Sequence, residues 1–96
     1  MGVDEILSSK RDEILRIAAS HGVTTIRVFG SVARGNARPD SDVDFLIETG
    51  EGTSSWFPAG LVTDLEKILG RRVDVVTVRG LRPELRDQVI DEAVPL

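Results

Sequence analysis

The sequence contains no cysteine among its 96 residues. This absence excludes disulfide bonds, thiolate metal sites and cysteine nucleophiles. The chain also has no apolar run near the ~18 residues that a membrane helix needs. Its first residues, MGVDEILSSKR, include no hydrophobic region of a signal peptide. We therefore expect a cytoplasmic protein that does not enter a membrane.

Basic residues are few. The chain has 12 Lys and Arg against 16 Asp and Glu, which gives a formal net charge of -4 at pH 7. Proteins that bind DNA or RNA contact the phosphates with clustered Lys and Arg. Nucleic acid is therefore not expected as the main partner.

Length and composition indicate a single globular domain over residues 1–96, with 41% hydrophobic and 29% charged residues. A domain of this size buries somewhat over ~60% of its unfolded surface, which is enough for one modest core. Whether the protein forms homo-oligomers is left open by the sequence.

Hydrophobic periodicity predicts helices that alternate with strands. The expected helices span residues 4–21, 31–35, 58–69 and 82–94, and the expected strands span 24–30, 42–48 and 71–78. The first helix is expected to start at Asp4 or to restart near Ser9. In the closing helix we expect the apolar side chains to face inward: Leu85, Val89, Ile90 and Ala93. This order predicts an α/β fold with a small mixed sheet of three or slightly more strands, flanked by helices.

Asp42 and Asp44 lie in a predicted strand on either side of Val43. Successive strand side chains point to opposite faces, so the two carboxylates share one face while Val43 and Phe45 point into the core. Two carboxylates at this spacing can bind hard cations, and Mg²⁺ prefers a few carboxylates together with phosphate oxygens and water. The pattern suggests a metal and phosphate site, and the alternative is a solvated polar strand face.

Gly30 and Ser31 follow the first predicted strand, where the chain enters a turn. Backbone N–H groups at such a position can bind phosphate, Gly30 permits close approach, and Ser31 adds a hydroxyl. Arg34 and Arg38 lie in the same connection and could bind a triphosphate through fixed positive charge, although arginines here are ordinarily on the surface.

A third carboxylate, Asp74, lies among valines in the last predicted strand. An unpaired charge in a largely buried strand is costly, so this side chain must be paired, metal-bound or at an exposed end of the strand. One interpretation pairs it with Arg71 or Arg72. The other places it beside Asp42 and Asp44 in a cluster of three carboxylates.

The stretch GSVARGNARPDSDVD contains Gly-Ser, ten residues and then Asp-x-Asp. This spacing resembles the signature of the polymerase-β-like nucleotidyltransferase superfamily, and Asp74 stands where that superfamily has its third carboxylate. From about residue 10 onward the chain is most similar to the minimal single-domain nucleotidyltransferases, the MNT family, including LGRRVDVVTV and LRPELRDQVIDEAVPL.

The resemblance implies a polymerase-β palm-like fold and a role for each of these residues. Asp42 and Asp44 would hold two Mg²⁺ ions with a nucleoside triphosphate, ATP being expected. Ser31 and the Gly30 backbone would bind its phosphates. Asp74 would ligate one ion and help to deprotonate the acceptor hydroxyl.

The same resemblance implies a partner, because many MNT proteins act as antitoxins that transfer AMP to a tyrosine of a HEPN-domain toxin. Two alternatives remain open. One is transfer to a small hydroxylated molecule such as an aminoglycoside, although those relatives usually carry an extra domain. The other is a non-catalytic antitoxin that neutralises its partner by binding alone.

Three further residues, His21, Trp56 and Phe57, are interpreted as structural in the first place. His21, the one histidine, is expected at a helix end, where a cation suits the helix dipole. Trp56 and Phe57 are expected to cover the sheet, with an adenine platform or a partner contact as the alternative.

Overall fold

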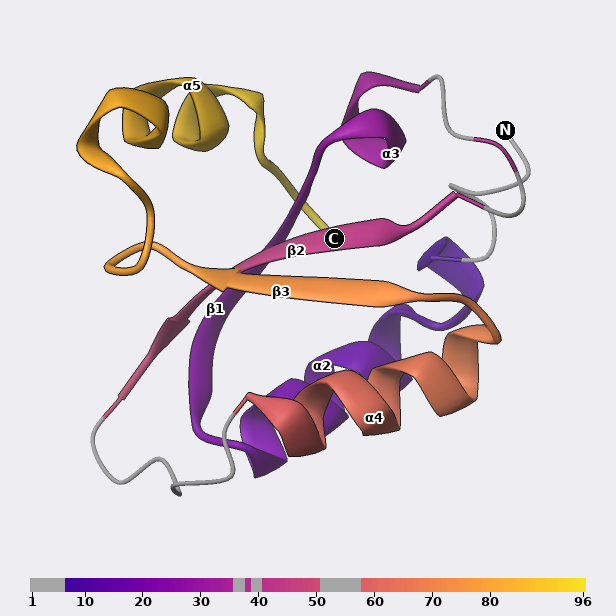
Figure 1. Cartoon of the computed structure of the whole chain (residues 1–96). Helices are drawn as coiled ribbons and strands as arrows, with labels where there is room; N and C mark the ends of the chain where they lie inside the picture. Colours follow the sequence, from indigo (N-terminus) through magenta and orange to yellow (C-terminus); the bar gives the residue numbers. More distant parts are fainter. Residues whose placement is uncertain (1–6, 36–37, 39–40, 51–57) are drawn as a thin grey trace.

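The computed structural model describes residues 7–35, 38, 41–50 and 58–96. Its elements in chain order are α2 (Arg11–Ser20), β1 (Val23–Phe29), α3 (Ser31–Arg34), β2 (Val43–Thr49), α4 (Ala59–Leu69), β3 (Val73–Thr77), α5 (Pro83–Glu92) and β4 (Val94–Pro95) (Figure 1). Residues 7–9 form a further piece of helix, and the break at Lys10 lies close to the restart predicted near Ser9. The predicted start at Asp4 lies outside the described residues.

The strands form one mixed sheet in the order β3-β2-β1-β4. β1 pairs antiparallel with both β2 and β4, and β2 pairs in parallel with β3. The predicted α/β fold with a small mixed sheet is therefore confirmed. Several predicted strand ends are wrong by one or two residues: β1 ends at Phe29, β2 begins at Val43, and β3 spans Val73–Thr77.

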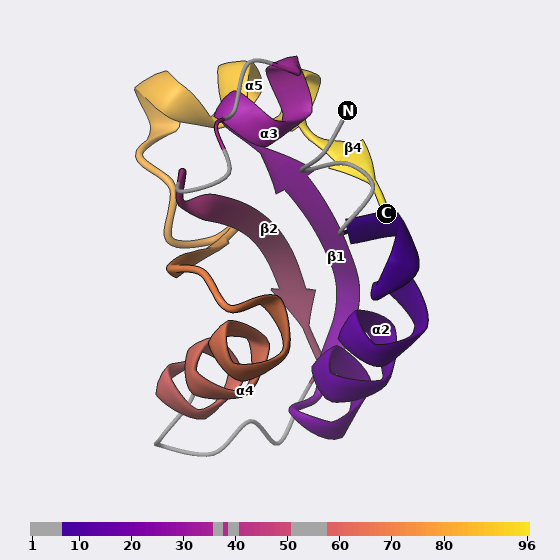
Figure 2. The ribbon, with the colours of Figure 1, turned by 90° about the vertical axis from the view of Figure 1, so that its right-hand side faces the viewer.

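The main core lies between the sheet and the side-by-side helices α2 and α4 (Figures 1 and 2). Alternate residues of β2, namely Val43, Phe45 and Ile47, point into this core and are at most 1% exposed. The helices add apolar side chains at helical spacing: Ile14, Ala18, Leu61, Leu65 and Leu69. The face of β2 that carries Asp44 consequently points away from α2 and α4.

The end of the chain differs from the prediction. The closing helix is expected to continue to residue 94, but α5 ends at Glu92 and the extended residue Ala93 leads into β4. β4 pairs with β1 through Val94 and Pro95. Proline cannot continue a helix, and it disfavours helical geometry in the residue before it, which explains the switch to strand.

The expected inward face of α5 is also wrong in part. No residue of α5 is buried, and Leu85 is 46% exposed. Val89, Ile90 and Ala93 are half-buried. α5 lies on the side of the sheet opposite α2 and α4 (Figure 1), and none of its residues belongs to their core. No helix in the described part of the chain is long and apolar enough to cross a membrane.

Candidate active site

Asp44 lies at the centre of the candidate site. It is half-buried in β2, and its register partner in the parallel strand β3 is Asp74. Paired residues of neighbouring strands lie about 4.8 Å apart, so the two carboxylates emerge side by side. Asp42 is exposed and lies just before β2, two residues from Asp44. The structure therefore brings together two aspartates that are thirty residues apart in sequence.

The electrostatics of Asp44 reflect this crowding. Burial raises the pKa of its carboxyl above the usual value, and the negative charges of Asp74 and Asp42 raise it further. The guanidinium of Arg34 lowers this pKa, and the carboxylate of Glu92 adds a smaller increase. All four charged side chains thus act on Asp44, and the negative ones outweigh the positive one.

Gly30 forms one wall of the site. Its φ of +74° and ψ of −151° lie in a backbone region that is essentially restricted to glycine. A Cβ atom at this position would lie 2.3 Å from Oδ2 of Asp44 and 3.2 Å from its Cγ. The missing side chain is therefore what allows the Asp44 carboxylate to lie against the backbone. Ser31, the next residue, is half-buried and begins α3.

Arg34 ends α3 and forms an ion pair with Glu92, the last residue of α5. Nη1 of Arg34 donates to Oε1 of Glu92. Glu92 is not among the residues that the sequence predicts for the site. Nothing in the sequence pairs two residues that lie 58 positions apart, and the contact depends on how α5 folds back over the sheet.

Arg71 has a different role from the pairing with Asp74 that the sequence left open. Its Nη2 donates to the backbone carbonyl of Arg38 at 3.0 Å and also to that of Ser41. The N–H of Val43 donates to the carbonyl of Arg72 at 2.9 Å. These bonds hold the segment that leads into Asp42 and Asp44 against the segment that leads into Asp74.

Across the described residues, no three Asp, Glu, His or Cys side chains are close enough together to form a metal group. The predicted Mg²⁺ site therefore stays a prediction that rests on the shared face of the three aspartates.

The remaining sequence candidates lie elsewhere. His21 caps the end of α2 as predicted, and its Nε2 lies 2.9 Å from Oδ2 of Asp64 in α4, so it joins the two core helices. Arg38 is exposed. Trp56 and Phe57 lie outside the described residues.

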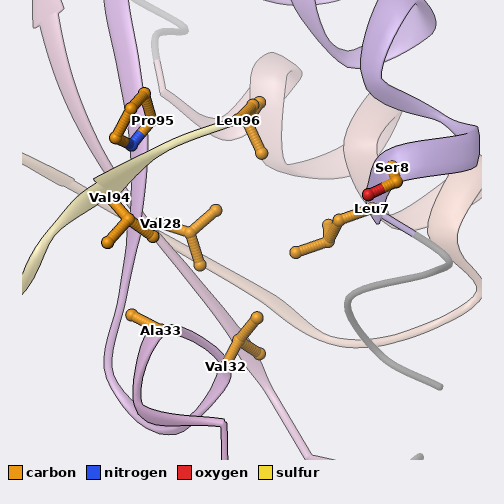
Figure 3. Close-up of a pocket in the computed structure, with 8 residues that line it drawn as sticks. All are labelled: Leu7, Ser8, Val28, Val32, Ala33, Val94, Pro95 and Leu96. Atoms are coloured by element: carbon orange, nitrogen blue, oxygen red, sulfur yellow. The ribbon is translucent and has the colours of Figure 1, made fainter. Parts of the chain in front are cut away.

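A pocket of about 230 Å³ lies beside β4 (Figure 3). None of its lining residues has a charged side chain: Leu7, Ser8, Val28, Val32, Ala33, Val94, Pro95 and Leu96. Val28 is the register partner of Phe45, so it lies on the face of the sheet opposite Asp44. This pocket is therefore separate from the carboxylates.

Comparison with known proteins gives independent evidence for the family to which the chain belongs. Residues 11–96 match the family model of the nucleotidyltransferase domain. A candidate protein adenylyltransferase of Methanocaldococcus jannaschii is 39% identical over 94 residues, which cover 98% of this chain and 97% of the relative. The protein adenylyltransferase MntA of Thermococcus cleftensis is 37% identical over 92 residues, which cover 96% of this chain and 90% of the relative.

Two solved structures are similar in fold. One is described as a candidate minimal nucleotidyltransferase and has a TM-score of 0.86 at 51% identity, over 96% of this chain and 94% of that chain. The other is a toxin–antitoxin structure with AMP-PNP, with a TM-score of 0.75 at 22% identity, over 88% of this chain and 69% of that chain. The second likeness supports the fold alone.

Proposed function

The chain belongs to the nucleotidyltransferase domain family, and from this premise we propose that it transfers AMP from ATP to a hydroxyl group of a partner protein. The observation that carries the proposal is the pairing of Asp44 with Asp74, beside Asp42 and against Gly30. Two relatives described as protein adenylyltransferases support the choice of AMP and of a protein acceptor. We propose that residues 1–96 act as a single domain.

The donor set of this face fits Mg²⁺. Asp42, Asp44 and Asp74 offer only carboxylate oxygens, which hard cations prefer. Burial raises the pKa of Asp44, and the negative charges of Asp74 and Asp42 raise it further, so a cation bound beside these carboxylates would offset their mutual repulsion. We propose that these three aspartates hold two Mg²⁺ ions, which when bound stabilise charge on the attacking and leaving oxygens.

The chain's own groups then position the nucleotide. Gly30 lets the backbone approach closely, so its N–H can donate to a phosphate oxygen, and the Ser31 hydroxyl can donate beside it. Arg34 adds a permanent positive charge at the end of α3. Such a site works mainly by orientation and electrostatics and needs no covalent intermediate with the protein.

In the transfer step, the acceptor oxygen attacks the α-phosphorus of ATP. A bond forms between that oxygen and phosphorus, the bond from the α-phosphorus to the bridging oxygen breaks, and pyrophosphate leaves. The hydroxyl proton goes to the carboxylate of Asp74, which is exposed and thus accessible to an acceptor from outside.

For the acceptor we propose a tyrosine of a HEPN-type toxin, so that the protein acts as an antitoxin. The relative MntA of Thermococcus cleftensis, which is described as a protein adenylyltransferase, supports a protein as the acceptor. The 96 residues contain no tyrosine, so these residues do not themselves supply a tyrosine acceptor. The exposed position of Asp42 and Asp74 leaves the site open to such a partner.

The test is mass spectrometry of the intact partner that co-purifies with the protein, after incubation with ATP and Mg²⁺. We expect the partner to gain the mass of one or more AMP groups. Neutralisation of the partner without added mass would instead support a binding-only antitoxin. If AMP were instead found only on added small hydroxylated molecules and not on the partner, the small-molecule alternative would be supported.

A further inference from the structure

α5 is held to the rest of the molecule by little apolar packing. None of its residues is buried, and the chain after it returns to the sheet through the two residues of β4. The Arg34–Glu92 ion pair connects the end of α5 to the end of α3. A helix with few buried contacts depends more on such a polar contact for its position than a core helix does.

The two partners differ in exposure. The Glu92 side chain is 20% exposed, whereas the Arg34 side chain is 54% exposed. The carboxylate is thus the more enclosed member, and the guanidinium extends from it toward solvent. Both charges act on the pKa of Asp44, Arg34 lowering it and Glu92 raising it, so the pair lies within electrostatic reach of the candidate active site.

The bond to Glu92 uses Nη1 of Arg34. A guanidinium has five N–H donors in a rigid planar fork, so donors remain for a second anion. An arginine side chain that is already fixed loses less conformational freedom when it binds a phosphate. Glu92 can therefore improve phosphate binding without contacting the nucleotide.

We propose that Glu92 is a positioning residue of the nucleotide site, whose carboxylate fixes Arg34 so that its remaining donors bind the β and γ phosphates of ATP. This inference rests on the proposed function. It assigns a role to the end of α5, an element that contributes nothing buried to the core. The opposite role, in which Glu92 competes with phosphate for Arg34, predicts the opposite change in affinity.

The test compares equilibrium binding of ATP and of AMP, with Mg²⁺ present, for the wild type and Glu92→Ala. We expect ATP binding to weaken about tenfold and AMP binding to change less than about twofold, because AMP lacks the phosphates that Arg34 would contact. Glu84→Ala is the matched control, since Glu84 is an exposed glutamate in the first turn of the same helix. It should bind both nucleotides as the wild type does.

A double variant separates positioning from general damage to the fold. If Glu92 acts through Arg34, then Glu92→Ala should weaken ATP binding no further in an Arg34→Ala background. Unchanged or tighter ATP binding by Glu92→Ala would overturn the inference, and so would equal weakening of ATP and AMP. A wild-type protein that binds no ATP would overturn the proposed function as well.

Discussion

Among the described residues, the carboxyl group of Asp44 lies in surroundings that oppose its negative charge. Burial and the neighbouring carboxylates raise its pKa in the folded protein, whereas the unfolded chain has the ordinary carboxyl pKa of about 3.9. Between these two pKa values the folded state binds more protons than the unfolded state. Stability from this group therefore falls as the pH rises through that range, and at pH 7 the charge of Asp44 destabilises the fold.

We therefore predict that Asp44→Asn melts at a higher temperature than the wild type at pH 7 in the absence of divalent cations. The difference should shrink as the pH is lowered toward the ordinary carboxyl pKa, because the wild-type side chain then becomes neutral too. Calorimetry at pH 7 and at a pH near the ordinary carboxyl pKa measures the difference in melting temperature. Asp87→Asn, on the exposed surface of α5, is the control. A lower melting temperature for Asp44→Asn at pH 7 would contradict the account.

Gly30 offers a second test at the residue scale. We predict that Gly30→Ala weakens ATP binding at least about tenfold, because a Cβ atom 2.3 Å from Oδ2 of Asp44 must displace that carboxylate. Gly35 at the other end of α3 is the matched control, because its φ is +78° and a Cβ atom there would meet none of the described residues beyond its chain neighbours within 4 Å. Gly35→Ala should lower stability by about 1–2 kcal/mol through its backbone conformation alone, yet leave ATP binding near the wild-type value.

Equal loss of ATP binding in the two variants would argue against a specific role for the contact between Gly30 and Asp44. Thermal melting of both variants shows whether each remains folded at the temperature of the binding measurement.

The helices α4 and α5 differ in how much of their apolar surface is buried against the rest of the molecule. Leu65 of α4 is fully buried, whereas Leu85 of α5 is 46% exposed. We predict that Leu65→Ala lowers the free energy of unfolding by about 2–5 kcal/mol, while Leu85→Ala changes it by no more than about 0.5 kcal/mol. Urea unfolding of the two variants measures both values. A large loss for Leu85→Ala would mean that α5 packs into a core as the sequence pattern suggested.

A comparison of β2 and α5 shows when hydrophobic periodicity is enough to predict a buried face. The alternation around Val43 and Phe45 correctly predicted a core-facing side of β2, because strand periodicity is a local property. The apolar spacing that includes Leu85 predicted an inward face of α5, yet that face is only half-buried and Leu85 itself is exposed. Hydrophobic periodicity predicts which side chains share a face. Whether that face is buried depends on tertiary packing against another element.

In the whole molecule, the candidate site contains some residues that are close together in the sequence and others that only the fold brings together. Gly30, Ser31, Asp42 and Asp44 could be predicted because their spacing lies within one short stretch. The neighbourhood of Asp44 and Asp74 depends on parallel pairing of β2 with β3. The residues alone left this cluster open beside a pairing of Asp74 with Arg71 or Arg72, and the resemblance to a family favoured the cluster. Glu92 could not be predicted, because its contact with Arg34 is set by the path of the chain after β3.

The most direct test of the central claim uses ATP labelled at the α-phosphate or at the γ-phosphate, incubated with the protein, Mg²⁺ and its co-purified partner. We predict that the α-label alone is transferred to the partner and that Asp44→Asn lowers transfer at least ~100-fold, about 2.7 kcal/mol. Transfer of the γ-label, or undiminished transfer by Asp44→Asn, would contradict a nucleotidyltransferase site built on these carboxylates.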